Sequence, residues 1–333
     1  MKQALVTGGG GFVGLAVVRL LREMGIRTLV VGRHHYPEVE AVGGISLKGD
    51  IRDPAFLTTS MAGCDTVFHV AALAGIWGPW DDYYSINVRG TQNVIAACEQ
   101  NKVARLVYTS TPSVVFNGES IQGLDESLPY AKSPLCHYAA TKIMAEKLVL
   151  QANGPELMTT ALRPHLVWGP GDTNLIPRLL ARGRQGALKI VGDGQNRVDI
   201  SYIDNVAQAH IAAAGNLEGG GGAAGQPFFI SQGEPVLLWD WINELFSRLA
   251  IPPVTKRVSF LKAYRVGWLL EKVSGILRRQ SEPPMTRFLA EQLAKSHWFA
   301  IDRAREVLDY SPQVTSEEGM ERLLAWLKRE EQR

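Results

Sequence analysis

Short apolar runs alternate with helix-length amphipathic segments along the first half of the chain. Between the runs lie helical patterns at 12–24, 54–62, 88–98 and 137–151. Strands that alternate with helices form parallel sheets covered on both faces. The pattern therefore predicts an α/β fold with a Rossmann-type, doubly wound parallel sheet. The apolar runs expected to form its strands are residues 4–6, 26–31, 45–47, 66–70, 105–108 and 159–162.

The alternation weakens after about residue 170, where short segments rich in glycine and proline appear. We expect a dinucleotide-binding domain over residues 1–167 and a smaller, mainly substrate-binding C-terminal domain over 168–333. Segments near 197–215 and 226–232 are expected to return to the first domain's sheet. The glycine run 219–222 predicts a surface loop, and 239–249 and 316–328 predict amphipathic helices.

Composition narrows the class of protein. The 333 residues are 46% hydrophobic and 20% charged, with a net charge of +2, which indicates a folded protein and disfavours nucleic-acid binding. No segment approaches the roughly 20 apolar residues of a membrane span. The three cysteines Cys64, Cys98 and Cys136 lack metal-ligand spacing, and the first residues lack a secretory pattern. We expect a cytoplasmic protein with reduced thiols and no metal site.

Glycines dominate the turn after the first predicted strand. Residues 7–14 read TGGGGFVG, which satisfies both GxGxxG and GxxGxxG spacing. Between a strand and a helix, such a turn lets backbone N–H groups and the helix N-terminus bind a pyrophosphate. The sequence predicts a dinucleotide site that includes Gly8, Gly11, Phe12, Val13 and Gly14.

The residues at the end of the second predicted strand indicate whether the protein binds NADPH or NADH. An Asp or Glu usually binds a free ribose 2′-hydroxyl there, whereas this chain has Gly32-Arg33. A guanidinium suits a 2′-phosphate, so NADPH is favoured over NADH. A solvated Arg33 is the competing interpretation. Asp50 and Ile51 after the third strand, and Ala71 and Ala72 after the fourth, are further expected cofactor contacts.

Tyr138 and Lys142 form a YxxxK pattern within a predicted helix and so share one helix face. An ammonium beside a phenol is expected to lower the pKa of the tyrosine toward the range of proton transfer. The strand 105–108 ends in Thr109-Ser110-Thr111, where a hydroxyl is placed to share a substrate oxygen with the tyrosine. Solvated helix residues and strand-end capping are the alternative interpretations.

These residues resemble the extended short-chain dehydrogenase/reductase family. The resemblance is carried by TGGGGFVG, Asp50, NVRGT (87–91), YTST, YAATK, LRP (162–164), WGPG (168–171) and YID (202–204). It implies that Tyr138 is the acid/base and that Lys142 modulates it and binds the ribose. It also implies that Thr111, with Ser110 as the alternative, is the catalytic hydroxyl. Pro164 would lie near the nicotinamide and Asn87 near the cofactor.

Within the family, the chain is similar to the 3β-hydroxysteroid dehydrogenase branch and, more narrowly, to bacterial reductases of 2-alkyl-3-oxoalkanoates in long-chain olefin biosynthesis. The long stretch SEPPMTRFLAEQLAKSHWF (281–299) carries much of this likeness. An apolar stripe over 260–277 is compatible with a lipid pocket, a membrane surface or an ordinary core helix. Expected substrate contacts are Trp77, Ser113, His165 and Trp168.

The resemblance implies an oxidoreductase that uses NADPH to reduce the 3-keto group of a long-chain apolar β-keto acid. The alternatives are a 3β-hydroxysteroid or sterol-carboxylate dehydrogenase and, in another class, a non-catalytic NADPH-sensing protein. A homodimer built on the helices 88–98 and 137–151 is expected, with association with other olefin-pathway enzymes and at most a peripheral contact with membrane.

Overall fold

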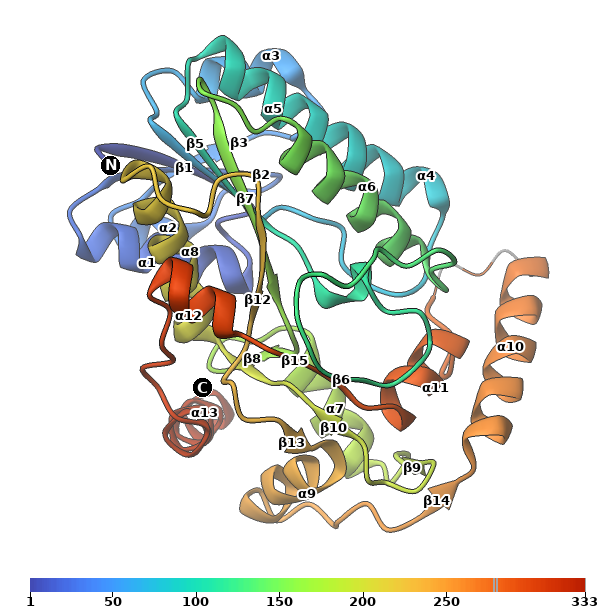
Figure 1. Cartoon of the computed structure of the whole chain (residues 1–333). Coiled ribbons are helices and arrows are strands. Elements are labelled where there is room, and N and C mark those ends of the chain that lie inside the picture. The colour runs from blue at the N-terminus through green and yellow to red at the C-terminus, as the bar shows by residue number, and fades with distance from the viewer. Residues whose placement is uncertain (278, 280, 333) are drawn as a thin grey trace.

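A seven-stranded parallel sheet forms the centre of the computed structural model, which describes residues 1–277, 279 and 281–332 (Figure 1). The strand order is β12-β7-β5-β4-β1-β2-β3. This confirms the α/β, Rossmann-type arrangement. The strands are β1 (Gln3–Thr7), β2 (Arg27–Gly32), β3 (Ile45–Lys48), β4 (Thr66–His69), β5 (Arg105–Thr109), β7 (Met158–Pro164) and β12 (Pro227–Ile230).

Alternating side chains of the strands build two apolar layers, one on each face of the sheet. Along β1, Ala4 and Val6 join the larger cluster, whereas Leu5 joins the other. The first face is covered by α1 (Phe12–Glu23) and α8 (Ile203–Glu218), which pack on each other. The second face is covered by α3 (Pro54–Ser60), α5 (Gly90–Gln100) and α6 (His137–Gln151). α2 (Pro37–Ala41) contacts β3 and α1.

Short helical segments continue the two loops that approach the carboxyl edge of the sheet. After β4 the chain forms α4 (Trp80–Tyr83) and a π-helical segment η1 (Tyr84–Arg89) that leads directly into α5. After β5 it forms a 3₁₀ turn η2 (Pro112–Val114). Ligands of open α/β sheets bind beyond this edge.

The remaining chain forms smaller sheets and helices beside this edge. The strands are β6 (Ile121–Leu124), β8 (Val167–Trp168), β9 (Ile190–Val191), β10 (Arg197–Val198), β11 (Ser201–Tyr202), β13 (Val236–Leu237), β14 (Arg257–Val258) and β15 (His297–Phe299). The helices are α7 (Leu175–Arg184), α9 (Leu238–Arg248), α10 (Phe260–Ile276), α11 (Arg287–Ala294), α12 (Asp302–Leu308) and α13 (Ser316–Glu331).

The later segments also contribute to the large sheet, because β12 pairs in parallel with β7 and α8 packs against β5 and β7. The two amphipathic segments predicted at 239–249 and 316–328 are helices, α9 and α13. Within the part of the chain that the structure describes, no helix is long and apolar enough to span a bilayer.

Candidate active site

The glycine turn between β1 and α1 requires glycine for steric reasons. Gly8 adopts φ +69°, and a Cβ there would lie 2.8 Å from the Ala71 Cα at the end of β4. A Cβ on Gly14 would lie 2.2 Å from the Gly8 carbonyl oxygen. Helix α1 begins after Gly11, which has no side chain to cap the first amides. The turn and the helix N-terminus together fit a pyrophosphate.

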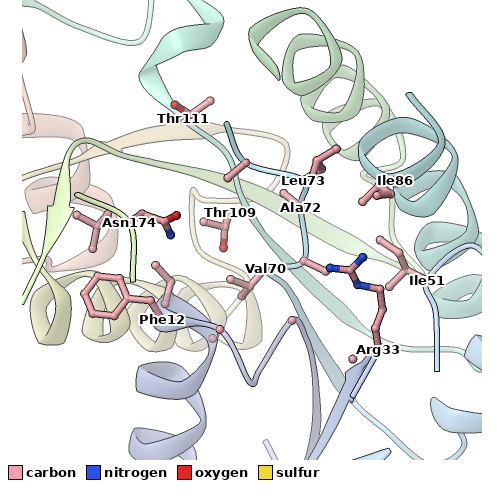
Figure 2. Close-up of a pocket in the computed structure, with 18 of the residues that line it drawn as sticks. Phe12, Arg33, Ile51, Val70, Ala72, Leu73, Ile86, Thr109, Thr111 and Asn174 are labelled. Carbon is pink, nitrogen blue, oxygen red and sulfur yellow. The ribbon is translucent and has the colours of Figure 1, made fainter. Parts of the chain in front are cut away.

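A cavity of about 470 Å³ runs from this turn along the carboxyl edge of the sheet. In Figure 2, Arg33 and Ile51 lie on one side of it, Phe12 and Asn174 on the other, and Thr111 at its upper end. The cavity brings together most of the residues that the sequence singled out. These are Gly8, Gly11, Phe12, Val13, Gly14, Arg33, Asp50, Ile51, Ala71, Ala72, Ser110, Thr111, Tyr138, Lys142 and Pro164.

One end of the cavity is formed by the ends of β2 and β3. Arg33 is exposed and lines the cavity directly after β2. Asp50, after β3, accepts hydrogen bonds from the Arg52 guanidinium, with Nη2 2.6 Å from Oδ2. The Arg52 hydrogen bonds hold the pKa of Asp50 below its ordinary value, so this carboxyl is ionised and already paired. Arg33 is therefore available to a ligand anion beside an internally neutralised pair.

Tyr138 and Lys142 lie on α6 at the other end of the cavity. The Lys142 Nζ donates to the Thr109 carbonyl oxygen at 2.6 Å and lies 4.1 Å from the centre of the Tyr108 ring. Burial lowers the pKa of Lys142 to about 7, against the opposing effect of Glu146. Burial also raises the pKa of Tyr138 to about 12, against a hydrogen bond with Thr111 that lowers it.

The expectation that Lys142 lowers the pKa of Tyr138 is therefore wrong for this structure. Loss of solvation dominates, and the Lys142 ammonium is directed to a backbone carbonyl. The consequence is a phenol that keeps its proton at neutral pH. A protonated hydroxyl next to Thr111 is suited to donate a proton to a developing alkoxide.

A buried polar cluster beneath this end was not anticipated from the sequence. The Glu146 carboxylate is fully buried and accepts hydrogen bonds from the Ser110 hydroxyl and the Tyr130 hydroxyl. Arg163 donates to both of its oxygens, from Nη2 at 2.5 Å and from Nε at 3.1 Å. The only sequence signal is that Glu146 follows Lys142 by four residues on the same helix face. The Ser110 hydroxyl therefore donates its hydrogen bond to the Glu146 carboxylate.

Two further predicted contacts support the cavity from behind. Asn87 is buried, and its side chain bridges the N–H and C=O of Leu73 at 2.7 and 3.1 Å. Leu73 lines the cavity, so Asn87 fixes that part of its wall. Ser113 hydrogen bonds with Thr111 through both its amide and its hydroxyl. Neither Asn87 nor Ser113 is itself among the residues that line the cavity.

The structure does not bring the other predicted substrate residues to this cavity. Trp168 is fully buried in the core between Tyr202 and Trp241, because β8 carries it inward. The buried His165 Nε2 lies 2.6 Å from the His297 Nδ1 instead of facing a substrate carboxylate. Trp77 lines a second cavity, and its indole N–H donates to the Arg279 carbonyl oxygen at 3.0 Å.

Several residues of the cavity were missed by reasoning from the sequence. Asp172 is buried and caps α7 by accepting from the amides of Asn174, Leu175 and Ile176. Its place in the GPGD turn is the only signal for it. The others are neighbours of predicted residues or close the cavity from distant elements: Val31, Tyr36, Gly49, Val70, Ala74, Ile86, Val167, Asn174 and Leu175.

Known proteins match both the sequence and the overall fold. The model of the 3-beta hydroxysteroid dehydrogenase/isomerase family matches residues 5–260. The chain belongs to this family. Membership confirms the resemblance inferred from the motifs and identifies the chain as an oxidoreductase of the extended short-chain type.

Individual relatives of the family span nearly the whole chain. A 2-alkyl-3-oxoalkanoate reductase of Stenotrophomonas maltophilia (strain K279a) is 49% identical over 96% of this chain and 98% of its own length. A decarboxylating sterol-4-alpha-carboxylate 3-dehydrogenase of Mus musculus is 32% identical over 96% of this chain and 90% of its own. The solved structure of MoeE5 in complex with UDP-glucose and NAD superposes with a TM-score of 0.77, at 26% identity over 99% of both chains.

Proposed function

We propose that this protein uses NADPH to reduce the 3-keto group of a long-chain 2-alkyl-3-oxoalkanoate to the 2-alkyl-3-hydroxyalkanoate. The observation that carries the proposal is the single cavity that joins the glycine turn to Tyr138, Thr111 and Lys142. The 49% identity to a reductase with this substrate supports the choice of reaction.

The cavity's residues fit a nicotinamide dinucleotide. The steric need for glycine at Gly8 and Gly14 and the free N-terminus of α1 match its pyrophosphate. Pro164 would flank the nicotinamide and Lys142 would bind its ribose, while Asp50, Ile51, Ala71 and Ala72 would line the adenosine half. When bound, this cofactor supplies the hydride that the carbonyl carbon accepts.

The protein's own side chains would carry out the proton transfer. Tyr138 would donate its phenolic proton to the oxygen of the former carbonyl, and its raised pKa keeps that proton on the phenol at neutral pH. Thr111, which hydrogen bonds with Tyr138, would donate a second hydrogen bond to the same substrate oxygen. We assign this role to Thr111 and not to Ser110, because the Thr111 hydroxyl hydrogen bonds with Tyr138, whereas the Ser110 hydroxyl donates to the buried Glu146 carboxylate. The cavity wall at Leu73, which the Asn87 side chain holds through two hydrogen bonds, would keep the cofactor in place.

Preference for NADPH is assigned to Arg33. Its guanidinium is exposed at the end of β2, where the chain offers no carboxylate to a free 2′-hydroxyl. A 2′-phosphate would form a charge-assisted pair with it.

The remaining parts of the proposal concern organisation. Residues 1–167 would bind the cofactor and 168–333 mainly the substrate, in a cytoplasmic enzyme that meets membrane only at its surface. Helices α5 and α6 lie side by side and would form the contact of a homodimer (Figure 1). Other enzymes of olefin formation would supply the keto acid and consume the hydroxy acid.

A second candidate is oxidation of a 3-hydroxysterol that carries a neighbouring carboxylate, as the name of the mouse relative states for that protein. The two reactions differ in what becomes of the carboxylate. We therefore propose a test with NADPH that carries deuterium at both C4 positions and a freshly saponified 2-alkyl-3-oxoalkanoate. Deuterium at C3 of a product that retains its carboxylate supports the reductase, and a product without deuterium at C3 overturns it.

A further inference from the structure

The outer face of helix α10 exposes large apolar side chains. Leu261 and Leu269 are 54% and 55% exposed, Trp268 is 48% exposed and Ile276 is 81% exposed. In Figure 1 the helix forms an outer edge of the molecule, with α11 on its inner side. Water would normally disfavour so much apolar surface on one exposed helix.

Packing fixes which side of α10 faces outward. Ala263, Gly267 and Ser274 are buried, and a Cβ on Gly267 would lie 2.6 Å from the Thr286 carbonyl carbon. This close approach to the start of α11 is possible only with glycine, so the helix cannot rotate to hide its apolar side chains. The exposed residues therefore belong to a fixed surface.

The same surface is cationic. Lys262, Arg265 and Lys272 are exposed along it. Glu271 is the one acidic residue among the seventeen of α10, and its carboxylate is bound by Arg287, with Oε2 2.6 Å from Nε. The outer face thus combines long apolar side chains with three positive charges and carries no free carboxylate of its own.

We propose that α10 is an interfacial helix that lies on an anionic lipid bilayer. The apolar side chains would enter the boundary of the acyl chains, and the lysine and arginine side chains would extend to the lipid phosphates. Anionic lipid attracts such a basic surface. A second copy of the chain is a poorer occupant, because a symmetric contact would bring the same three cations together.

Docking in this way has a consequence for the reaction, which rests on the proposed function. A second cavity of about 620 Å³ lies beside the C-terminal end of the helix and is lined by Glu271, Lys272, Gly275 and Ile276 of α10. His137, the residue before Tyr138, lines the same cavity. A substrate with two long alkyl chains partitions into lipid. With α10 on the bilayer, this cavity would lie against the membrane that holds the substrate.

Sedimentation of the whole protein with vesicles tests the proposal. Wild type is expected to sediment with vesicles of phosphatidylglycerol and phosphatidylcholine, less with phosphatidylcholine alone, and less at high salt. The triple variant Leu261→Ser, Trp268→Ser, Leu269→Ser is expected to lower the partition coefficient about tenfold or more. The pair Lys262→Glu, Arg265→Glu is expected to lose binding to the anionic vesicles selectively.

Matched controls test whether the loss of an exposed side chain elsewhere on the protein also changes vesicle binding. Met24→Ser removes an exposed apolar side chain directly after α1 and Lys328→Glu reverses an exposed charge on α13, and both are expected to bind as wild type. Thermal unfolding and NADPH affinity of each variant verify that it is folded.

Three results overturn the proposal: wild type that stays in the supernatant, a triple variant that binds as wild type does, or α10 variants that change the oligomeric state in sedimentation velocity. The last would make the face a protein interface. Sedimentation requires no turnover, so its outcome is independent of the reductase assignment. Vesicle binding without reduction of the keto acid would retain the docking surface and reject the substrate.

Discussion

The Ser110 hydroxyl donates a hydrogen bond to the buried carboxylate of Glu146. The two neighbouring hydroxyls at the end of β5 therefore have different surroundings, since Thr111 instead hydrogen bonds with Tyr138. The Ser110 hydroxyl belongs to the buried polar cluster, whereas the Thr111 hydroxyl hydrogen bonds with Tyr138 and Ser113.

Substitution of these two hydroxyls is expected to have separate effects. Thr111→Val should lower kcat about 10²-fold, because a donor to the developing oxyanion is lost, and Thr111→Ser should restore most of it. Ser110→Ala should lower the free energy of unfolding by about 2 kcal/mol, because Glu146 loses a donor, while most activity remains. Steady-state kinetics and urea unfolding of the same preparations measure both. The reverse pattern would assign the catalytic hydroxyl to Ser110.

Removal of the phenolic hydroxyl tests the proton donor. Tyr138→Phe should lower kcat about 10²- to 10⁴-fold, the usual contribution of a positioned acid, and leave the affinity for NADPH unchanged. Single-turnover kinetics and a fluorescence titration of NADPH provide the two values. Activity near that of wild type would exclude Tyr138 as the donor.

The low pKa of Lys142 predicts how stability changes with pH. Its pKa is about 7 in the folded protein against an ordinary value of 10.5, so the unfolded chain binds more protons between these values. The contribution of Lys142 to the free energy of unfolding should therefore rise as pH increases from about 7 to about 10. Urea unfolding of the cofactor-free wild type and Lys142→Met across this range isolates the effect. A constant difference between the two proteins would contradict the lowered pKa.

Arg33 is expected to decide between the two nicotinamide cofactors. Arg33→Gln should raise the Kd of NADPH about 10- to 10²-fold, as for loss of a charged hydrogen bond, and leave the Kd of NADH unchanged. Arg52→Gln is the matched control, because Arg52 is paired with Asp50 beside the same end of the cavity. Equal effects of Arg33→Gln on both cofactors would make Arg33 a solvated bystander.

Removal of one partner from the buried ion pair beneath the site is expected to destabilise the protein. Glu146→Leu should lower the free energy of unfolding by about 3–5 kcal/mol, because it leaves the Arg163 charge buried without its partner. The double variant Glu146→Leu, Arg163→Met should recover much of that loss, because no buried charge remains. Urea unfolding compares the three proteins. A double variant less stable than the single one would show that the pair contributes more than mutual neutralisation.

Local patterns predicted the sheet, the glycine turn and the Tyr138/Lys142 face, because each depends on residues within a few positions of one another. The expected substrate contacts of His165 and Trp168 are wrong because both side chains pack on residues that are distant in sequence. His165 meets His297, which is 132 residues away, and Trp168 packs on Tyr202 and Trp241. Residues that only the tertiary fold brings together show no local sequence pattern from which their contact could be predicted.

The pKa of Tyr138 illustrates the same limit in energetic terms. The i, i+4 spacing correctly places Lys142 on the same helix as the phenol, but not where its ammonium points. The extent of burial, which raises the pKa, depends on the whole fold.

The most direct measurement compares substrates and cofactors in the oxidative direction, where the acid is stable. Initial rates of NADP⁺ and NAD⁺ reduction are recorded with a long-chain 2-alkyl-3-hydroxyalkanoate and, in parallel, with a 3β-hydroxysteroid. The account predicts turnover of the branched hydroxy acid with a preference for NADP⁺. Turnover of the steroid with NAD⁺, and none of the branched acid, would contradict both the substrate and the role of Arg33.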